Sequence, residues 1–244
     1  MVDWDGFDSL AYVYQNYGRR ILREDAQIMR FVVDELRDLG LAPDSLRTVA
    51  DIGAGPNLYP ALLLAPYIAV DGSLELVEHS AANLDYLRAA LDGMDGEKSA
   101  TWSKFERHLR LLGHRTSIQK VRDVAAVKAG SIFDLPTDHY DAVMCFFVAE
   151  SITRDPEVFA TALDSLMRSL KPGGLFVTAH MVGSTGYKAD LEAAEYPACK
   201  LSMSDFEKSY TPYGTFRSIL THHSPEQALR PGYDGMTALV GRRH

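Results

Sequence analysis

The sequence predicts an α/β fold, in which a mostly parallel sheet of seven strands has helices on both faces and contains one antiparallel strand. Apolar runs of strand length alternate with helical patterns along most of the chain. The last two predicted strands follow one another without a helix, which indicates a terminal hairpin. With 244 residues and 46% hydrophobic content, the chain is expected to form a single domain over residues 1–244.

The first half of the chain supplies three predicted strands and two helices. Apolar residues at helical spacing indicate a helix over residues 24–39, and Ser80 is placed to cap a helix that ends near Leu91. Residues 93–124 interrupt the alternation and are expected to form a helical insertion. The predicted strands in this half are residues 49–52, 74–78 and 125–132.

The second half supplies the other four strands. Residues 140–147 are apolar almost throughout, as expected for a strand covered on both faces. Asp155 and Pro156 are suited to begin a helix, the glycine-rich turn 171–174 to end it, and a short helix is predicted near residues 202–210. The remaining predicted strands are residues 175–179, 216–222 and 236–240.

The composition agrees with a soluble enzyme. A net charge of −8 argues against a nucleic-acid surface, and no apolar run reaches the length of a membrane span. No basic-then-apolar leader is evident. Cys145 and Cys199 form no CxxC pair, and the histidines lack metal-type partners at close spacing. We therefore expect a cytoplasmic protein with free thiols and no metal, membrane or nucleic-acid partner.

Residues 49–57 are the most informative stretch of the chain. An apolar run from Thr48 reaches Asp51, and Gly53 and Gly55 then allow the backbone to approach a ligand closely. A dinucleotide fingerprint needs a third glycine, but Leu58 occupies that position. An acid beside the turn would also repel a pyrophosphate, so a ligand with a cationic amino-acid part fits better. The pattern resembles motif I of S-adenosylmethionine-dependent methyltransferases.

Glu78 is the second acid that points to a nucleotide ligand. It ends the second predicted strand, where a carboxylate can accept hydrogen bonds from both ribose hydroxyls. Asn83 follows about one helical turn later and can join it. Asp71 is a competing candidate, but Asp71 and Gly72 read as a turn, whereas the residues after Glu78 continue into a helix.

Four blocks together resemble the small-molecule methyltransferase family of the nicotinamide, phenylethanolamine and thioether N-methyltransferases. They are the tyrosine pair Tyr12 and Tyr17, the motif 51–59, the block 78–83, and the turn 170–174. The resemblance covers about residues 11–187. It implies a Rossmann-like seven-stranded class I methyltransferase sheet with an N-terminal helical lid over residues 1–23. The implied cofactor is S-adenosylmethionine, which leaves as S-adenosylhomocysteine.

The same resemblance implies which residues bind the cofactor. Tyr12 and Tyr17 would close over it, the glycine turn would hold its methionine end, and Glu78 with Asn83 would hold the ribose. Phe146 replaces a small polar family residue, so its backbone would serve there. The implied cofactor residues are Tyr12, Tyr17, Asp51, Gly53, Gly55, Asn57, Tyr59, Glu78, His79, Asn83, Ser131 and Phe146.

The acceptor side departs from the family. Glu150 falls where amine methyltransferases of the family have an acid that faces the substrate, and Tyr187 falls on an acceptor-pocket tyrosine. His180 stands where the nicotinamide enzyme has an aspartate, and Ser184 where the phenylethanolamine enzyme has a glutamate. These four residues are the predicted acceptor set. The departures argue against nicotinamide and phenylethanolamine as acceptors.

We predict methylation of a small-molecule amine or N-heterocycle, with Glu150 and His180 as catalytic residues. O- or S-methylation stays open, because His180 is suited to remove a proton from a hydroxyl or thiol. A noncatalytic cofactor-binding scaffold is a further alternative. A nicotinamide-dependent oxidoreductase is disfavoured by the missing glycine, and an RNA or protein methyltransferase by the acidic charge. The expected assembly is a monomer or weak homodimer.

Overall fold

The computed structural model describes residues 4–18, 20–93, 96–188, 195–221 and 232–244. Its main sheet has seven strands in the order β3-β2-β1-β4-β5-β9-β8, and of these β9 runs in the direction opposite to the other six. The predicted fold class is confirmed. The strands are β1 (Leu46–Ile52), β2 (Ile68–Glu78), β3 (Ala125–Ala129), β4 (Tyr140–Phe146), β5 (Leu170–Val182), β8 (Gly214–Leu220) and β9 (Gly235–Arg243).

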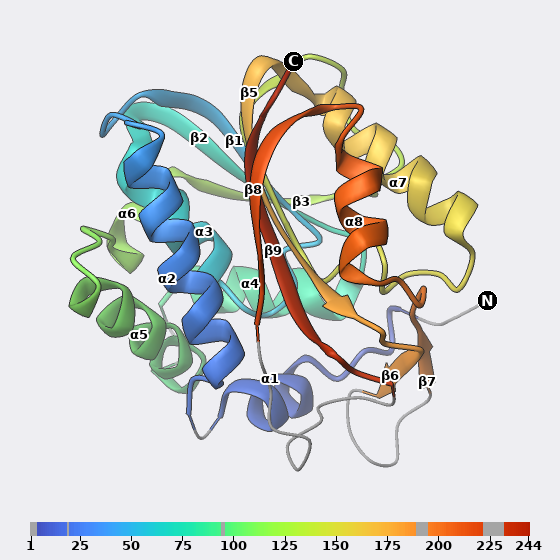
Figure 1. The fold of residues 1–244 in the computed structure, drawn as a ribbon. Helices are drawn as coiled ribbons and strands as arrows, with labels where there is room; N and C mark the ends of the chain where they lie inside the picture. Colours follow the sequence, from blue (N-terminus) through green and yellow to red (C-terminus); the bar gives the residue numbers. More distant parts are fainter. Residues whose placement is uncertain (1–3, 19, 94–95, 189–194, 222–231) are drawn as a thin grey trace.

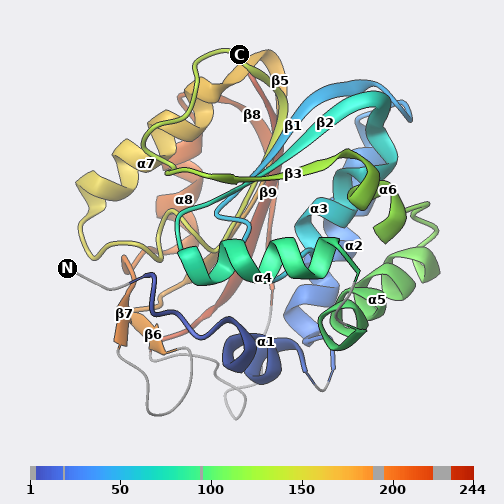
Figure 2. The ribbon, with the colours of Figure 1, turned by 180° about the vertical axis from the view of Figure 1, so that it is seen from behind.

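Helices cover both faces of the sheet (Figures 1 and 2). One face packs against α2 to α6 and the other against α7 and α8, while α1 lies at one end of the molecule. The helices are α1 (Ser9–Tyr17), α2 (Arg23–Asp38), α3 (Tyr59–Leu64), the short 3-10 turn η1 (Ala65–Tyr67), α4 (Ala81–Leu91), α5 (Gly96–Leu111), α6 (Ile118–Val124), α7 (Pro156–Ser169) and α8 (Met203–Tyr210). None of the helices in the described part of the chain has the length and apolarity of a membrane span.

Alternation along the central strands builds two hydrophobic cores. In β4, Ala142 and Met144 join the core beneath α2 to α6, whereas Val143 and Cys145 join the core beneath α7 and α8. All four side chains are fully buried. Because successive side chains of a strand point to opposite faces, an apolar run without polar gaps is required in a strand that is covered on both sides.

Several strand ends differ from the sequence prediction. Strand β2 begins at Ile68, so Asp71 lies within the strand rather than in a turn, and β5 begins at Leu170 and takes in the predicted turn 171–174. Pairing with β1 and β4 extends both strands, with a register shift in each pair. Strand β4 ends at Phe146 because Phe147 adopts a left-handed φ of 62°. The last residue of predicted strand 216–222 lies outside the described residues.

An additional hairpin, β6 (Gly186–Lys188) with β7 (Glu195–Pro197), was not predicted. It lies close to the N-terminal segment, which we define as residues 4–17 (Figure 1). Phe7 of this segment and Tyr196 of the hairpin form a small aromatic core, with ring centroids 5.4 Å apart. Trp4 also packs on Tyr196, with ring centroids 4.8 Å apart. The two segments therefore form one wall, although they are far apart in the sequence.

Candidate functional site

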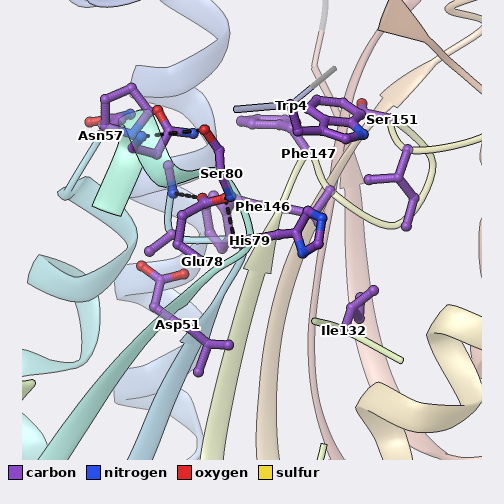
Figure 3. A pocket seen from close by; sticks show the side chains of 18 of the residues that line it. Trp4, Asp51, Asn57, Glu78, His79, Ser80, Ile132, Phe146, Phe147 and Ser151 are labelled. Atoms are coloured by element: carbon purple, nitrogen blue, oxygen red, sulfur yellow. Dashed lines mark hydrogen bonds between the residues drawn. The ribbon is translucent and has the colours of Figure 1, made fainter. Parts of the chain in front are cut away.

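A cavity of about 390 Å³ lies at the carboxyl ends of β1, β2, β3 and β4. Residues of the N-terminal segment and of hairpin β6–β7 complete its walls. Ligands of open α/β sheets bind at this edge, and the volume is within the range of small-molecule sites. Figure 3 shows Asp51 and Glu78 near one another at the ends of their strands, with Trp4, Phe147 and Ser151 on another side of the cavity.

The turn after β1 depends on glycine. Gly53 has a φ of 67°, and its N–H donates to the carbonyl of Val77 at the end of β2. A Cβ on Gly53 would lie 2.5 Å from the Val148 side chain, so a larger residue is excluded by space as well as by φ. The indole N–H of Trp102 in α5 donates to the carbonyl of Pro56 at 3.3 Å. The turn is thus held from both sides.

Asp51 has an unpaired oxygen in this cavity. Its side chain is 1% exposed, and Oδ2 has no hydrogen-bond partner among the described residues. Burial, together with the charge of Glu78, raises the pKa of Asp51 to about 8. A buried acid without a partner is costly unless a ligand supplies one. An ammonium group of a bound amino acid would meet that requirement.

Glu78 organises the backbone around the cavity. Oε2 accepts from the N–H of Gly55 at 2.8 Å, and Oε1 accepts from His79 at 2.7 Å and Ser80 at 2.8 Å. A carboxylate has about four acceptor positions, so Oε2 retains room for another donor. The side chain lines the cavity and is 7% exposed. The competing candidate, Asp71, is instead exposed and paired with Arg47.

The tyrosines predicted to close over the cofactor line the same cavity. Tyr12 and Tyr17 lie with ring centroids 6.1 Å apart, and Tyr17 is buried and hydrogen-bonded to Asn57. Tyr59 is fully buried, and its hydroxyl donates to Asp25 Oδ1 at 3.0 Å. Burial raises the pKa of both Tyr17 and Tyr59 well above the ordinary value, so both hydroxyls stay protonated.

All of the predicted cofactor residues line this cavity. His79 is exposed at its rim, Ser131 follows β3, and Phe146 is the last residue of β4. The side-chain oxygen of Asn83 already has a partner, because the Ser9 hydroxyl donates to Asn83 Oδ1 at 2.7 Å. Among the described residues, no group of three or more His, Cys, Asp or Glu side chains is arranged to hold a metal ion.

The predicted acceptor set is divided. Tyr187 lines the cavity, but Glu150, His180 and Ser184 do not, and all three are fully buried. Glu150 Oε2 lies 2.7 Å from His180 Nδ1, and the other ring nitrogen of His180 lies 2.9 Å from the Tyr210 hydroxyl. Burial raises the pKa of Glu150, but the charge and hydrogen bond of His180 outweigh it, and the net pKa is lowered. The structure therefore pairs the two predicted catalytic residues away from the cavity surface.

Aromatic side chains that the sequence analysis did not identify line the other end of the cavity. They come from the N-terminal segment and from the residues after β4, and Tyr187 adds a ring that stacks on Tyr196 at 5.2 Å. Because they lie outside regular periodic elements, no spacing in the sequence marks them. The additional aromatic residues are Trp4, Phe7 and Phe147, and Ser151 is a further lining residue that was not predicted.

The sheet order, the glycine turn and the acids at the ends of β1 and β2 are typical of the class I S-adenosylmethionine-dependent methyltransferases. The sequence model of the NNMT/PNMT/TEMT family matches residues 3–214, and the chain belongs to that family. S-adenosylmethionine is accordingly the cofactor, and the unpaired Asp51 oxygen fits its ammonium group. The expected family and cofactor are confirmed.

Solved structures agree in fold. An S-adenosylmethionine-dependent methyltransferase from Methanosarcina mazei matches with 13% identity and a TM-score of 0.55, covering 85% of this chain and 96% of its own. The 1,6-didemethyltoxoflavin-N1-methyltransferase of Burkholderia thailandensis, solved with that compound and S-adenosylhomocysteine, matches with 14% identity and a TM-score of 0.53, covering 96% and 86%. A comparison with curated proteins found no match.

Proposed function

We propose that this methyltransferase methylates a nitrogen atom of a small, flat acceptor, either an N-heterocycle or an amine attached to a ring. The observation that carries the proposal is the aromatic part of the cavity lining, where Trp4, Phe7 and Tyr187 all pack on Tyr196. Figure 3 shows Trp4 on another side of the cavity from Asp51 and Glu78. Aromatic walls favour planar ligands through offset stacking and edge contacts. The structurally similar 1,6-didemethyltoxoflavin-N1-methyltransferase of Burkholderia thailandensis acts at a nitrogen atom, which supports the same choice of atom.

The chemistry asks little of the protein besides alignment. S-adenosylmethionine, when bound, supplies a methyl group already activated on a sulfonium. The residues of the chain then position the acceptor and exclude water. A neutral nitrogen attacks without a base, whereas a hydroxyl or thiol needs one. His180 is fully buried with both ring nitrogens hydrogen-bonded, so its placement favours a nitrogen acceptor over the O- and S-alternatives.

The N-terminal segment serves as a lid in this proposal. Ser9 donates to Asn83, and Asp5 Oδ1 accepts from the N–H of Ala81 at 3.0 Å, so two contacts attach the segment to the start of α4. Tyr12 and Tyr17 come from the same segment and line the cavity. If these contacts break, the cofactor and the acceptor can enter the cavity. When the contacts form again, the segment shields both molecules from water.

The test is a screen of matched acceptors with labelled S-adenosylmethionine and mass spectrometry of the products. The panel compares N-heterocycles, ring-attached amines, aliphatic amines, phenols and thiols of similar size. We expect methylation at nitrogen on planar compounds. Faster turnover of a phenol or thiol would contradict the choice of atom, and faster turnover of aliphatic amines would contradict the flat acceptor.

A noncatalytic scaffold would give a different result in the same screen. It would bind S-adenosylhomocysteine in calorimetry and methylate no member of the panel. The variant Tyr187→Ala provides the matched control, because Tyr187 lines the cavity and stacks on Tyr196 and is not one of the predicted cofactor residues. It should reduce turnover of planar acceptors and leave S-adenosylhomocysteine affinity close to that of the wild type.

A further inference from the structure

Asp25 is a buried acid near the start of α2 that is hydrogen-bonded to the cavity-lining Tyr59. Its side chain is fully buried, and Oδ1 accepts the hydrogen bond from the Tyr59 hydroxyl at 3.0 Å. Oδ2 has no hydrogen-bond partner within the described residues. Tyr59 lines the cavity, whereas Asp25 does not. Asp25 therefore affects the hydrogen bonding of a residue that lines the cavity, although Asp25 itself does not line it.

The protonation state of Asp25 decides what Tyr59 offers to a ligand. A phenol has one proton to donate. When Asp25 is ionised, it accepts a hydrogen bond from the Tyr59 hydroxyl, and Tyr59 presents only lone pairs to the cavity. When Asp25 is a neutral acid, its own O–H can donate to the Tyr59 oxygen. The Tyr59 proton is then free to point into the cavity.

The neutral state suits the amino-acid end of the cofactor better. That end carries an ammonium and a carboxylate, and Asp51 already provides an acceptor for the ammonium. The carboxylate needs donors, and an ionised Asp25 close behind Tyr59 would repel it. The unpartnered Oδ2 points the same way, because a neutral carbonyl oxygen without a partner costs less than an ionised one.

We propose that Asp25 is a positioning residue for the cofactor. Asp25 takes up a proton from solvent when the cofactor binds, and the Tyr59 hydroxyl thereby turns toward the carboxylate of the cofactor's amino-acid part. In this step a proton leaves hydronium or a buffer acid and forms an O–H bond on Asp25, and no bond between heavy atoms changes. The titratable groups that interact with Asp25 are Glu24 of the same helix, Tyr17 of α1 and Tyr59 of α3. Burial, the largest influence, raises the pKa of Asp25 to about 7, so the proton is gained readily near neutral pH.

Proton uptake can be counted directly by calorimetry. S-adenosylhomocysteine is titrated into the full chain at about pH 8.5 in buffers of different ionisation enthalpy. Asp51, whose pKa is about 8, contributes equally to both variants and cancels in their comparison. The wild type should therefore take up about one proton more than Asp25→Asn. The neighbouring acid supplies a matched control, since Glu24→Gln should behave like the wild type.

Affinity gives a second measurement. Between about pH 8 and 9 the wild type should bind S-adenosylhomocysteine about tenfold more weakly, while Asp25→Asn should stay nearly constant. Asn can donate to the Tyr59 oxygen as the neutral acid does, so binding itself should survive. Equal proton uptake by the wild type and Asp25→Asn would overturn the proposal and leave Asp25 as a purely structural residue.

A second ligand keeps the test valid if Asp25→Asn fails to fold. 5′-Methylthioadenosine has the nucleoside and sulfur but no amino-acid part. Its binding to the wild type should involve no proton uptake by Asp25. The difference between the two ligands should therefore be about one proton at about pH 8.5. Identical proton numbers for the two ligands would also overturn the proposal.

Discussion

Glu150 and His180 form a hydrogen-bonded pair in which neither side chain has any exposed surface. Glu150 follows β4 and His180 lies on β5, so the pair links two neighbouring strands just beyond the end of one of them. His180 contacts Glu150 Oε2, and the N–H of Met181 and the hydroxyl of Ser151 donate to Glu150 Oε1. The Glu150 carboxylate is thus hydrogen-bonded within the protein, and Ser151 is the member of this group that lines the cavity.

Removing one partner of this pair should destabilise the protein. His180→Ala would leave the Glu150 carboxylate buried without its main partner, which typically costs about 3–5 kcal/mol of unfolding free energy. Tyr210→Phe removes only the hydroxyl beyond His180 and should cost about 1 kcal/mol. Urea denaturation measures both. A His180→Ala variant of normal stability but turnover reduced ~10²-fold would favour the catalytic role predicted from the sequence.

Asp51 should trade stability for binding. The folded state raises its pKa from 3.8 to about 8, so the ligand-free protein binds more protons than the unfolded chain in this interval, and stability falls as pH rises through it. Asp51→Asn should therefore stabilise the ligand-free protein at about pH 8, by about 1–3 kcal/mol. It should also weaken S-adenosylhomocysteine binding at least about tenfold. Thermal unfolding with and without ligand measures both effects, and a destabilised variant would show that the Asp51 charge is compensated in the fold.

Glu78 should be needed for cofactor binding. Glu78→Ala removes an acceptor from the cavity and releases the backbone N–H groups of Gly55 and Ser80. We expect affinity for S-adenosylhomocysteine to fall at least about tenfold, the scale of one charge-assisted hydrogen bond. Asp71→Ala is the control, because Asp71 is exposed and pairs with Arg47 at the surface. Calorimetry that finds the larger loss for Asp71→Ala would mean that the acid at the end of β2 is not the ribose ligand.

The N-terminal segment should become protected when ligand binds. Hydrogen exchange of residues 4–17 is expected to slow in the presence of saturating S-adenosylhomocysteine, because closure shields backbone amides. Ser9→Ala removes the bond to Asn83 and should speed exchange in the ligand-free protein. Unchanged exchange at saturation would indicate that the segment is already fixed and does not act as a lid.

Patterns with a strong local cause were predictable from the sequence. The apolar run of β4 and the glycine turn after Asp51 each have one structural solution, and strand β4 and turn 53–55 are found where they were expected. The ends of β2 and β5 were not predictable, because pairing with β1 and β4 extends them through residues that otherwise favour turns.

The acceptor side was harder for a different reason. The sequence identified Glu150 and His180 as chemically important but gave no sign that they would pair with each other, since the contact depends on strand register and on α8, which supplies Tyr210. Trp4 and Phe7 belong to no periodic pattern. Asp25 was unremarkable as an acid in the first turn of a helix, where such residues commonly occur. Only the position of Tyr59 gives it a role.

Helix α5 has a consequence for protein engineering. Lys104 Nζ donates to the carbonyls of Tyr17 and Gly18, where α1 ends, and Trp102 two residues earlier donates to Pro56 in the glycine turn. The end of α1, the glycine turn and α5 are therefore joined by hydrogen bonds, and a functional chimera needs matching residues in all three segments. A recombinant that exchanges residues 4–18 with a homologue should keep its fold and cofactor affinity only when α5 is taken from the same parent.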